Sequence, residues 1–307
     1  ECFYFSNRAK NMKIIFQNNF LNKLNKCEVS KLEKSFPKIS IVMPSYNQVE
    51  FIEKSILSVL NQDYKNFELI IIDGGSNDGT IEIIKKYQDY ISFWVSEKDK
   101  GQSDALNKGF KLASGEIYGW LNSDDIYLPN AFHNLMLAFK NNLNKKIVFG
   151  DWLSFDRNLK NINLNYAFDF NLNHFKYEGF HLNAQSMFWR SEVHHHFSGF
   201  DVELNNTMDY QMILEFGINE GEDSFLRIPY VIGGFRRYKG QKSSGMTTRV
   251  IKEHKSISKK YKYTDKYRLS GKIKRVYFRF RRAIWYVKRG GTLYLIKKLK
   301  KSYARGS

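Results

Sequence analysis

The sequence predicts an α/β protein with a doubly wound, mostly parallel β-sheet flanked by helices, followed by a basic helical C-terminal extension. From Lys38 onwards, short apolar runs alternate with segments of helical spacing, which is typical of βαβ units. Turn-forming polar residues follow several of these runs, as they do at the carboxyl ends of parallel strands. The extension is predicted from Lys and Arg residues concentrated near the C-terminus, between apolar residues at helical spacing.

The elements follow from apolar periodicity and turn signals. Ile52, Ile56 and Val59 share one helical face, and Pro129 suits the first turn of a helix. We predict helices at 49–62, 79–87, 103–113, 129–141 and 208–220. We predict strands at 39–43, 68–72, 91–95, 117–121 and 147–150, with a strand-like segment at 228–238. After Asp151 the alternation decays into an aromatic, Asn-rich region, and we expect binding specificity to lie in residues 152–181.

The charge divides the 307-residue chain unevenly. The net charge is +18, but residues 259–305 contain eighteen Lys or Arg and one acid, Asp265, so +17 belongs to this segment. We therefore expect a lead-in at 1–37, a nearly neutral α/β domain at 38–255 and a basic amphipathic tail at 256–307. The pair Gly290-Gly291 is expected to interrupt the tail's helical pattern.

The number of cysteines and the lengths of the apolar runs indicate the cellular compartment of the protein. Cys2 and Cys27 are the two cysteines, so a disulfide framework and a CxxC zinc pattern are excluded and a reducing compartment is favoured. No apolar run approaches the roughly 20 residues of a membrane-spanning helix. The first residues lack the layout of a signal peptide. We expect a cytoplasmic protein, peripheral on the inner face of the membrane.

Three acids lie at or near predicted strand ends: Asp73, Asp124 and Asp125. Carboxylates there can accept hydrogen bonds from a nucleobase or a ribose. Two adjacent carboxylates repel each other unless a cation such as Mg²⁺ or Mn²⁺ lies between them. The segment 74–79 is neither GxGxxG nor a P-loop, which disfavours a dehydrogenase or a P-loop kinase. Taken singly, each Asp is better explained as a helix cap or turn former, and it is the occurrence of three at successive strand ends that points to a ligand.

Four segments in order resemble glycosyltransferase family 2. They are Pro44-Ser-Tyr-Asn47, Ile72-Asp-Gly-Gly-Ser-Asn-Asp-Gly-Thr80, Ser96-Glu-Lys-Asp-Lys-Gly-Gln-Ser-Asp-Ala-Leu-Asn-Lys-Gly109 and Trp120-Leu-Asn-Ser-Asp-Asp125. The resemblance spans about residues 38–245. It implies the GT-A fold, which is Rossmann-like, and an inverting glycosyltransferase that uses a nucleotide-sugar and Mn²⁺ or Mg²⁺.

The resemblance also implies roles for individual residues. Tyr46 would lie against the nucleobase and Asp73 would hydrogen-bond it, while Asp124 would touch the ribose and Asp125 the metal. Asp209, in the segment Asn206-Thr-Met-Asp-Tyr-Gln211, would be the catalytic base that deprotonates the acceptor hydroxyl. The remaining nucleotide-sugar contacts are expected at Pro44, Ser45, Asn47, Gln102, Asp104 and Asn107.

The sequence departs from the family pattern at two places. Leu106 stands where many relatives carry Arg, so a diphosphate contact is expected to move to Gln102 or Lys108. Tyr238 occupies the place of a His that is sometimes a further metal ligand. Cationic or aromatic side chains could still contact the diphosphate or the acceptor, namely Trp189, Arg236, Arg237 and Lys242.

The triplet His194-His-His196 is not expected to hold a metal, because adjacent helical residues point in different directions. The basic tail at 256–307 has three interpretations. It binds an anionic membrane surface, it packs as helices on the domain at 38–255 (termed the body), or it binds nucleic acid. The first is favoured, with Tyr277, Phe280 and Trp285 as interfacial anchors, and no nucleic acid is expected because no recognition motif is present.

The sequence therefore predicts transfer of a sugar, with a UDP-sugar as the expected donor, to a glycan or lipid-linked glycan in bacterial surface-polysaccharide or glycolipid synthesis. Two alternatives remain. A sugar-nucleotide nucleotidyltransferase would need a Gly-rich basic loop after the first strand, where residues 45–48 read Ser-Tyr-Asn-Gln. A non-catalytic, membrane-associated sugar-nucleotide-binding protein would bind the donor without turnover.

Overall fold

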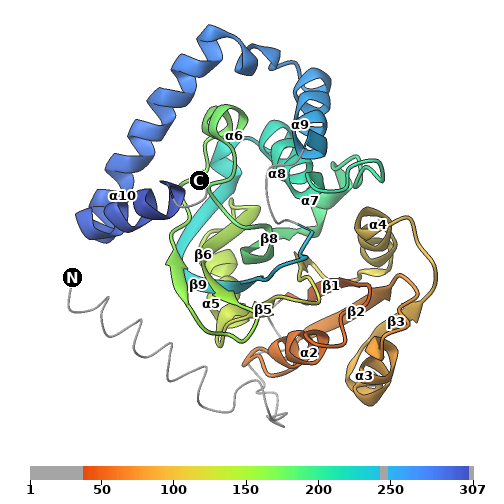
Figure 1. Cartoon of the computed structure of the whole chain (residues 1–307). Helices are drawn as coiled ribbons and strands as arrows, with labels where there is room; N and C mark the ends of the chain where they lie inside the picture. Colours follow the sequence, from red (N-terminus) through yellow and green to blue (C-terminus); the bar gives the residue numbers. More distant parts are fainter. Residues whose placement is uncertain (1–36, 243–247, 304–307) are drawn as a thin grey trace.

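The computed structural model describes residues 37–242 and 248–303, so the expected lead-in lies almost entirely outside the described residues. Within them, one sheet carries strands in the order β3-β2-β1-β4-β8-β6-β9-β5, and β7 pairs with β6 (Figure 1). The predicted α/β class with helices flanking the sheet is confirmed.

The first half of the sheet is parallel, as predicted. Its strands are β1 (Ile39–Ser45), β2 (Phe67–Asp73), β3 (Phe93–Ser96) and β4 (Ile117–Trp120). β1 lies between β2 and β4, with Ser45 opposite Asp73 in the register. The carboxyl ends of these strands therefore meet at one edge, where ligands bind in open α/β sheets.

Successive side chains of β1 point to opposite faces of the sheet, and different helices cover the two faces. Ile41 and Met43 of β1 point into the core beneath α2 (Ile52–Leu60), α3 (Thr80–Lys86) and α5 (Ala131–Asn141). Val42 points the opposite way, into the core shared with α4 (Gln102–Leu112) and α8 (Met208–Asn219). Because both faces are covered, β1 is buried throughout and reads as a continuous apolar run.

The second half of the sheet is mixed, and much of it was not predicted. It contains β5 (Ile126–Tyr127), β6 (Ile147–Asp156), β7 (Asn163–Asn165), β8 (Met187–Arg190) and β9 (Phe225–Arg237). β8 runs antiparallel to both β4 and β6, whereas β6 and β9 are parallel. The expected strand 147–150 is the start of the longer β6. The strand-like segment expected at 228–238 is β9. β7 and β8 escaped prediction because they are short, and the rest of β6 because it continues into the Asn-rich region without a break.

The C-terminal part consists of helices. α6 (Leu172–Glu178) and α7 (Ser191–His195) precede α8, and α9 (Thr248–Lys260) and α10 (Leu269–Tyr303) follow β9. The expected domain boundary at 255/256 falls inside α9, which buries Ile257 in the core of the body. The expected interruption at Gly290-Gly291 is not seen, because α10 is helical through both residues. In the described ranges, no helix is long and apolar enough to cross a bilayer.

Candidate active site

A cavity of about 820 Å³ opens beyond the carboxyl ends of β1 and β4. The loop after β3, the end of β9 and the first turn of α8 complete its wall. This volume is within the range of pockets that hold small-molecule ligands. Eight residues expected at the site line it: Pro44, Ser45, Tyr46, Gln102, Asp124, Asp209, Arg237 and Lys242.

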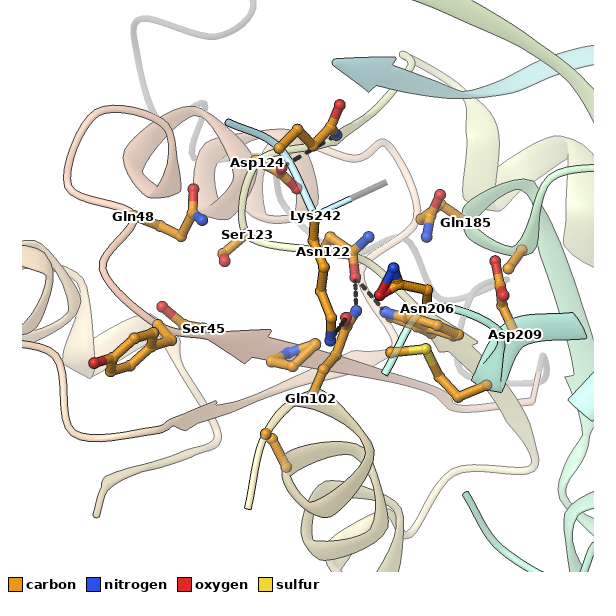
Figure 2. A pocket seen from close by; sticks show the side chains of 18 of the residues that line it. Ser45, Gln48, Gln102, Asn122, Ser123, Asp124, Gln185, Asn206, Asp209 and Lys242 are labelled. Atoms are coloured by element: carbon orange, nitrogen blue, oxygen red, sulfur yellow. Dashed lines mark hydrogen bonds between the residues drawn. The ribbon is translucent and has the colours of Figure 1, made fainter. Parts of the chain in front are cut away.

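The lining residues come from segments far apart in the chain. Figure 2 shows Ser45 and Gln48 at one end of the cavity and Asn206 and Asp209 at the other, with Lys242 in between. The cavity is thus long enough to separate a region at the end of β1 from a region at the start of α8. A reaction between two substrates needs room for both in one cavity, with their reacting atoms brought together.

The end of β1 is held by its neighbour β2. Asp73 is buried and accepts hydrogen bonds from the amide of Ser76 at 2.8 Å and from the hydroxyl of Ser96 at 2.7 Å. Asn47, with a φ of 50°, accepts a hydrogen bond from the amide of Asn77 at 3.0 Å. Neither Asp73 nor Asn47 lines the cavity, because the carboxylate and the carboxamide are used to hold the loop after β2. Tyr46 is 59% exposed at the cavity's edge, where a planar base could stack on it.

The adjacent carboxylates at the end of β4 have different surroundings. Asp124 lines the cavity and accepts a hydrogen bond from the Tyr238 hydroxyl at 3.0 Å. Asp125 is completely buried behind it, where it accepts the backbone amide of Arg236 at 2.8 Å. Burial raises the pKa of both carboxyls, and the neighbouring Asp124 adds to the pKa rise at Asp125. The side chain that faces the cavity is therefore that of Asp124, not that of the expected metal ligand Asp125.

Arg236 supports the site from behind instead of contacting a ligand. Its side chain is completely buried, and it donates to the carbonyl oxygens of Asp124 and Arg157, both at 2.7 Å. The guanidinium lies 4.6 Å from the ring centre of Phe51. The expected phosphate contact is thus not available to Arg236, because adjacent residues on β9 point to opposite faces and it is Arg237 that lines the cavity.

Polar side chains link α4 to the opposite wall. The amide of Gln102 donates to Asn122 Oδ1 at 2.7 Å, and the Trp120 indole donates to the same atom at 2.7 Å. The Lys242 ammonium lies 3.5 Å from Gln102 Oε1 (Figure 2). Gln102 is therefore placed as expected for a ligand contact, whereas Lys108 is paired with Glu97 at 2.7 Å.

Two other residues of α4 that were expected to contact the nucleotide-sugar, Asp104 and Asn107, instead bond to other parts of the protein. Asp104 lies 3.4 Å from Lys108 and accepts from the amide of Lys100 at 3.2 Å, away from the cavity. Asn107 exchanges two hydrogen bonds with the backbone of Phe200, at 2.8 and 2.9 Å. This pairing fixes α4 against the segment that precedes α8, so Asn107 positions the wall but does not line the cavity.

Trp189 lies in the core and does not line the cavity, so it is not placed for the expected contact with the diphosphate or the acceptor. Its side chain is 0% exposed, because Phe188 and Trp189 point to opposite faces of β8 and the Trp189 face is covered by Phe216. His194 packs near it, 4.5 Å from the ring of Phe110, and burial lowers its pKa to about 4. His196 instead pairs with Glu220 at 2.7 Å.

Asp209 lies in the first turn of α8 and lines the far end of the cavity. Its Oδ1 accepts a hydrogen bond from the backbone amide of Tyr210 at 2.8 Å. Loss of water around the carboxyl raises its pKa to about 6. A carboxyl group with this pKa is a stronger base than an ordinary aspartate while remaining mostly ionised at neutral pH.

Several lining residues were not predicted from the sequence. Asp99 lines the cavity beside Gly74, and burial raises the pKa of its carboxyl. It stands in the segment 96–109, which carries one of the family motifs, so a signal for it was present. Trp152 and Phe180 also line the cavity, and the ring of Phe180 lies 5.6 Å from that of Tyr210, the residue after Asp209. No motif marks these two, although they fall at the edges of the region expected to set specificity.

The described residues offer few protein ligands for a metal. No three His, Cys, Asp or Glu side chains are grouped as a metal site in residues 37–242 and 248–303. Asp124, with its raised pKa and its position at the cavity, fits a cation that is held mainly by substrate phosphates. This is the usual arrangement for Mg²⁺, which takes one or two carboxylates together with phosphate oxygens and water.

Comparison with known proteins relates the chain to a family of glycosyltransferases. The family model for Glycosyl transferase family 2 matches residues 40–208. The UDP-Glc:alpha-D-GlcNAc-diphosphoundecaprenol beta-1,3-glucosyltransferase WfgD of Escherichia coli is 39% identical over 107 residues, covering 34% of this chain and 42% of the relative. Among the first curated relatives, the aligned parts cover between 19% and 42% of the relative's length.

Two solved structures share the fold at low identity. TarS of S. aureus, in complex with UDP-GlcNAc, aligns with a TM-score of 0.58 and 15% identity over 88% of this chain and 92% of its own. The mannosyltransferase PcManGT of Pyrobaculum calidifontis, in complex with GDP-Man and Mn²⁺, gives a TM-score of 0.54 and 15% identity over 95% of this chain and 87% of its own. With the family model spanning more than half of the sequence, this chain belongs to glycosyl transferase family 2.

Proposed function

We propose that this protein is an inverting, metal-dependent glycosyltransferase that moves a sugar from a UDP-sugar to a hydroxyl of a glycan or lipid-linked glycan. The observation that carries the proposal is that one cavity holds Asp124 and Asp209 on different walls, with Lys242 between them. The donor would bind at the strand ends, and Asp209 at the start of α8 would act as the base.

The donor would occupy the end of the cavity near β1. Tyr46 offers a ring for the base, and Ser45 and Gln102 offer hydrogen-bonding groups. Lys242 and Arg237 offer positive charge for the diphosphate. UDP is favoured because TarS was solved in complex with UDP-GlcNAc and the Escherichia coli relative is named for UDP-Glc.

A divalent cation, Mn²⁺ or Mg²⁺, would be held by Asp124. When bound, it would neutralise charge on the departing diphosphate, the Lewis-acid role of a catalytic metal. Tyr238 and Gln241, at 3.0 and 3.4 Å from Asp124 Oδ2, would keep this carboxylate oriented. Asp125 would act behind it, by holding the backbone of Arg236.

Asp209 would take the proton of the acceptor hydroxyl. The acceptor oxygen then forms a bond to the anomeric carbon while the bond from that carbon to the phosphate oxygen breaks, and the nucleoside diphosphate leaves. Attack from the side opposite the leaving group inverts the anomeric carbon. The raised pKa of Asp209, about 6, favours this proton transfer.

The acceptor would lie against Trp152 and Phe180, because both line the cavity that Asp209 lines and aromatic faces stack on sugar rings. Amide groups nearby, including Gln185 and Asn206 (Figure 2), could bind sugar hydroxyls. A lipid-linked acceptor is favoured by the name of the Escherichia coli relative, in which the acceptor is alpha-D-GlcNAc-diphosphoundecaprenol. Such an acceptor would place the protein at the inner face of the membrane.

The test is nucleotide release from a panel of UDP-, GDP- and dTDP-sugars with Mn²⁺, Mg²⁺ or EDTA, with and without an undecaprenyl-diphosphate-linked sugar. We expect EDTA-sensitive release from a UDP-sugar that is faster with the acceptor. Asp209→Asn should lower the acceptor-dependent rate by about 10²- to 10⁴-fold, the usual contribution of a general base, and leave donor binding unchanged.

Two results would contradict the proposal. Donor binding without turnover, unaffected by Asp209→Asn, would indicate a non-catalytic binding protein. Formation of a nucleotide-sugar from a sugar phosphate and a nucleoside triphosphate would indicate a nucleotidyltransferase. As a matched control, Asp201→Asn changes an exposed acid that does not line the cavity and should leave every rate unchanged.

A further inference from the structure

Helix α10 has an apolar side that packs on the body. Phe278 is buried, with its ring 5.3 Å from His174 of α6. Trp285 packs on Phe168 at 5.2 Å, and its indole lies 3.2 Å from a carboxylate oxygen of Asp169. Trp285 is thus used for packing on the body and is not the interfacial anchor that the sequence suggested.

Polar contacts fix the rotation of α10 about its axis. Arg282 pairs with the nearly buried carboxylate of Glu178 on α6. The guanidinium of Arg275 donates to the carbonyl oxygen of Tyr177 at 3.2 Å, and Lys274 lies 2.9 Å from Asp265. With these contacts and the buried ring of Phe278, one side of the helix is held inward and the opposite side is presented outward.

The outward side carries a second row of apolar side chains, here termed the apolar stripe. Their spacings of three or four residues place them on one face of a helix. Their exposed fractions run from 73% at the start to 36% at the end. The stripe consists of Leu269, Ile273, Val276, Phe280, Ile284 and Val287. Soluble monomeric proteins rarely leave a contiguous apolar row of this length uncovered.

The charges beside the stripe indicate what covers it. Residues 269–303 contain twelve Lys or Arg and no Asp or Glu. At 3.6 residues per turn, Lys272 and Arg279 border one edge of the stripe, and Arg281 and Lys288 border the other; all four are exposed. An apolar face bordered by cations is the pattern of a helix that lies in the interface of an anionic bilayer.

Other partners fit this surface less well. A second copy of α10 would bring like charges together along both edges of the stripe. Nucleic acid would be attracted by the charge, but it stacks on aromatic rings and gains little from Leu, Ile and Val. Anionic phospholipid satisfies both features, since its headgroups meet the cations and its acyl chains meet the stripe.

We propose that the apolar stripe of α10 docks onto an anionic phospholipid surface, with the helix lying along the membrane and the rest of the protein on its inward side. This goes beyond the proposed sugar transfer, because it assigns a face and its ligand that do not depend on the chemistry in the cavity. Burial of Phe278 and packing of Trp285 against the body would keep the catalytic domain at a fixed orientation to the membrane.

The experiment is co-sedimentation of the full chain with vesicles of phosphatidylcholine alone or mixed with phosphatidylglycerol. We expect binding to the mixed vesicles only. The double variant V276E/F280E should lower the partition coefficient by at least about tenfold, because two of the most exposed apolar side chains of the stripe are lost and two acids face the headgroups. The matched control L143E/V202E places two acids at exposed apolar positions away from α10 and should bind as the wild type does.

Three results would overturn the proposal: equal binding of V276E/F280E and wild type, equal binding to both kinds of vesicle, or a wild-type dimer in solution that V276E/F280E converts to a monomer. The thermal unfolding midpoint of V276E/F280E should match that of the wild type, since both side chains point away from the body. Nucleotide release from a soluble donor should also be unchanged, so failure of docking and failure of the proposed transfer can be distinguished.

Discussion

Asp209, the proposed base, differs from the other aspartates of the chain by its position and not by its residue type. The chain has many aspartates, but this one combines a place in the cavity with a pKa of about 6 that results from burial. The ionised form is the one that can accept a proton. Because the folded protein favours the protonated form more than the unfolded chain does, this group stabilises the fold at acidic pH, and that contribution is lost as the pH rises through about 6.

The activity should follow this ionisation. We expect kcat/KM for transfer to fall about tenfold per pH unit below about pH 6 and to level off above it, because only ionised Asp209 serves as a base. A pH profile of the initial rate with saturating metal measures this. If the acidic limb persists unchanged in the residual activity of Asp209→Asn, another group is responsible.

Asp124 and Asp125 should respond differently to the same substitution. Asp124→Ala should abolish metal-dependent UDP binding with little effect on unfolding, because its side chain faces the cavity. Asp125→Ala should lower the free energy of unfolding by about 1–3 kcal/mol, because the buried amide of Arg236 loses its acceptor. Calorimetric titration with Mn²⁺ and UDP, together with thermal unfolding, separates the two. If Asp125→Ala instead loses metal binding and keeps its stability, Asp125 is the metal ligand and our assignment to Asp124 is wrong.

At the scale of elements, the position of α4 depends on a glycine. A Cβ at Gly109 would lie 2.3 Å from a methyl carbon of Val42, so the helix approaches β1 more closely than any other residue would allow. This close approach brings Gln102 of the same helix to Asn122 at the end of β4. One wall of the cavity is thus set by helix-to-sheet packing about two turns away from the lining residue.

Gly109→Ala should therefore lower the free energy of unfolding by about 1–3 kcal/mol, the usual cost of overpacking. It should also weaken UDP binding, because α4 must move outward with Gln102. Denaturant unfolding and nucleotide titration measure the two effects. Lys111→Ala, at an exposed position of the same helix, is the control and should stay within about 0.5 kcal/mol. Wild-type stability in the Gly109→Ala variant would show that the sheet yields without cost.

At the scale of the whole molecule, charge and catalysis are separated. The cavity lies in the body, whereas seventeen of the eighteen net positive charges lie in residues 259–305. Raising the ionic strength screens exposed charges, with a Debye length of about 10 Å at 0.1 M and about 3 Å at 1 M. High salt should therefore act on membrane docking and spare the chemistry in the cavity.

We expect salt near 1 M to lower transfer to a lipid-linked acceptor in anionic vesicles severalfold, while nucleotide release without acceptor changes little. Parallel rate measurements at low and high salt test this. Equal inhibition of both reactions would indicate that salt acts at the cavity and that the tail does not contribute to transfer.

The first half of the fold was predictable because its signals are local. Apolar runs such as 39–43 and 117–121 fall close to β1 and β4, and the polar residues after them mark the sheet edge. The short strands β7 and β8 were missed, because three or four residues carry too little periodicity. Their place in the sheet depends on pairing with β6, which is distant along the chain from β8.

The sequence by itself determined the fold class, the family motifs, the carboxylates Asp124 and Asp209 as site residues to test, and the separation of charge from the body. The tertiary structure decided which of two adjacent residues faces the cavity, Asp124 or Asp125, Arg237 or Arg236. It also decided which apolar side of α10 is buried and which remains exposed. Periodicity predicts which residues share one face of a helix or strand. The residues that pack against that face come from elsewhere in the chain, as Glu178 does for Arg282. Only the folded arrangement contains that information.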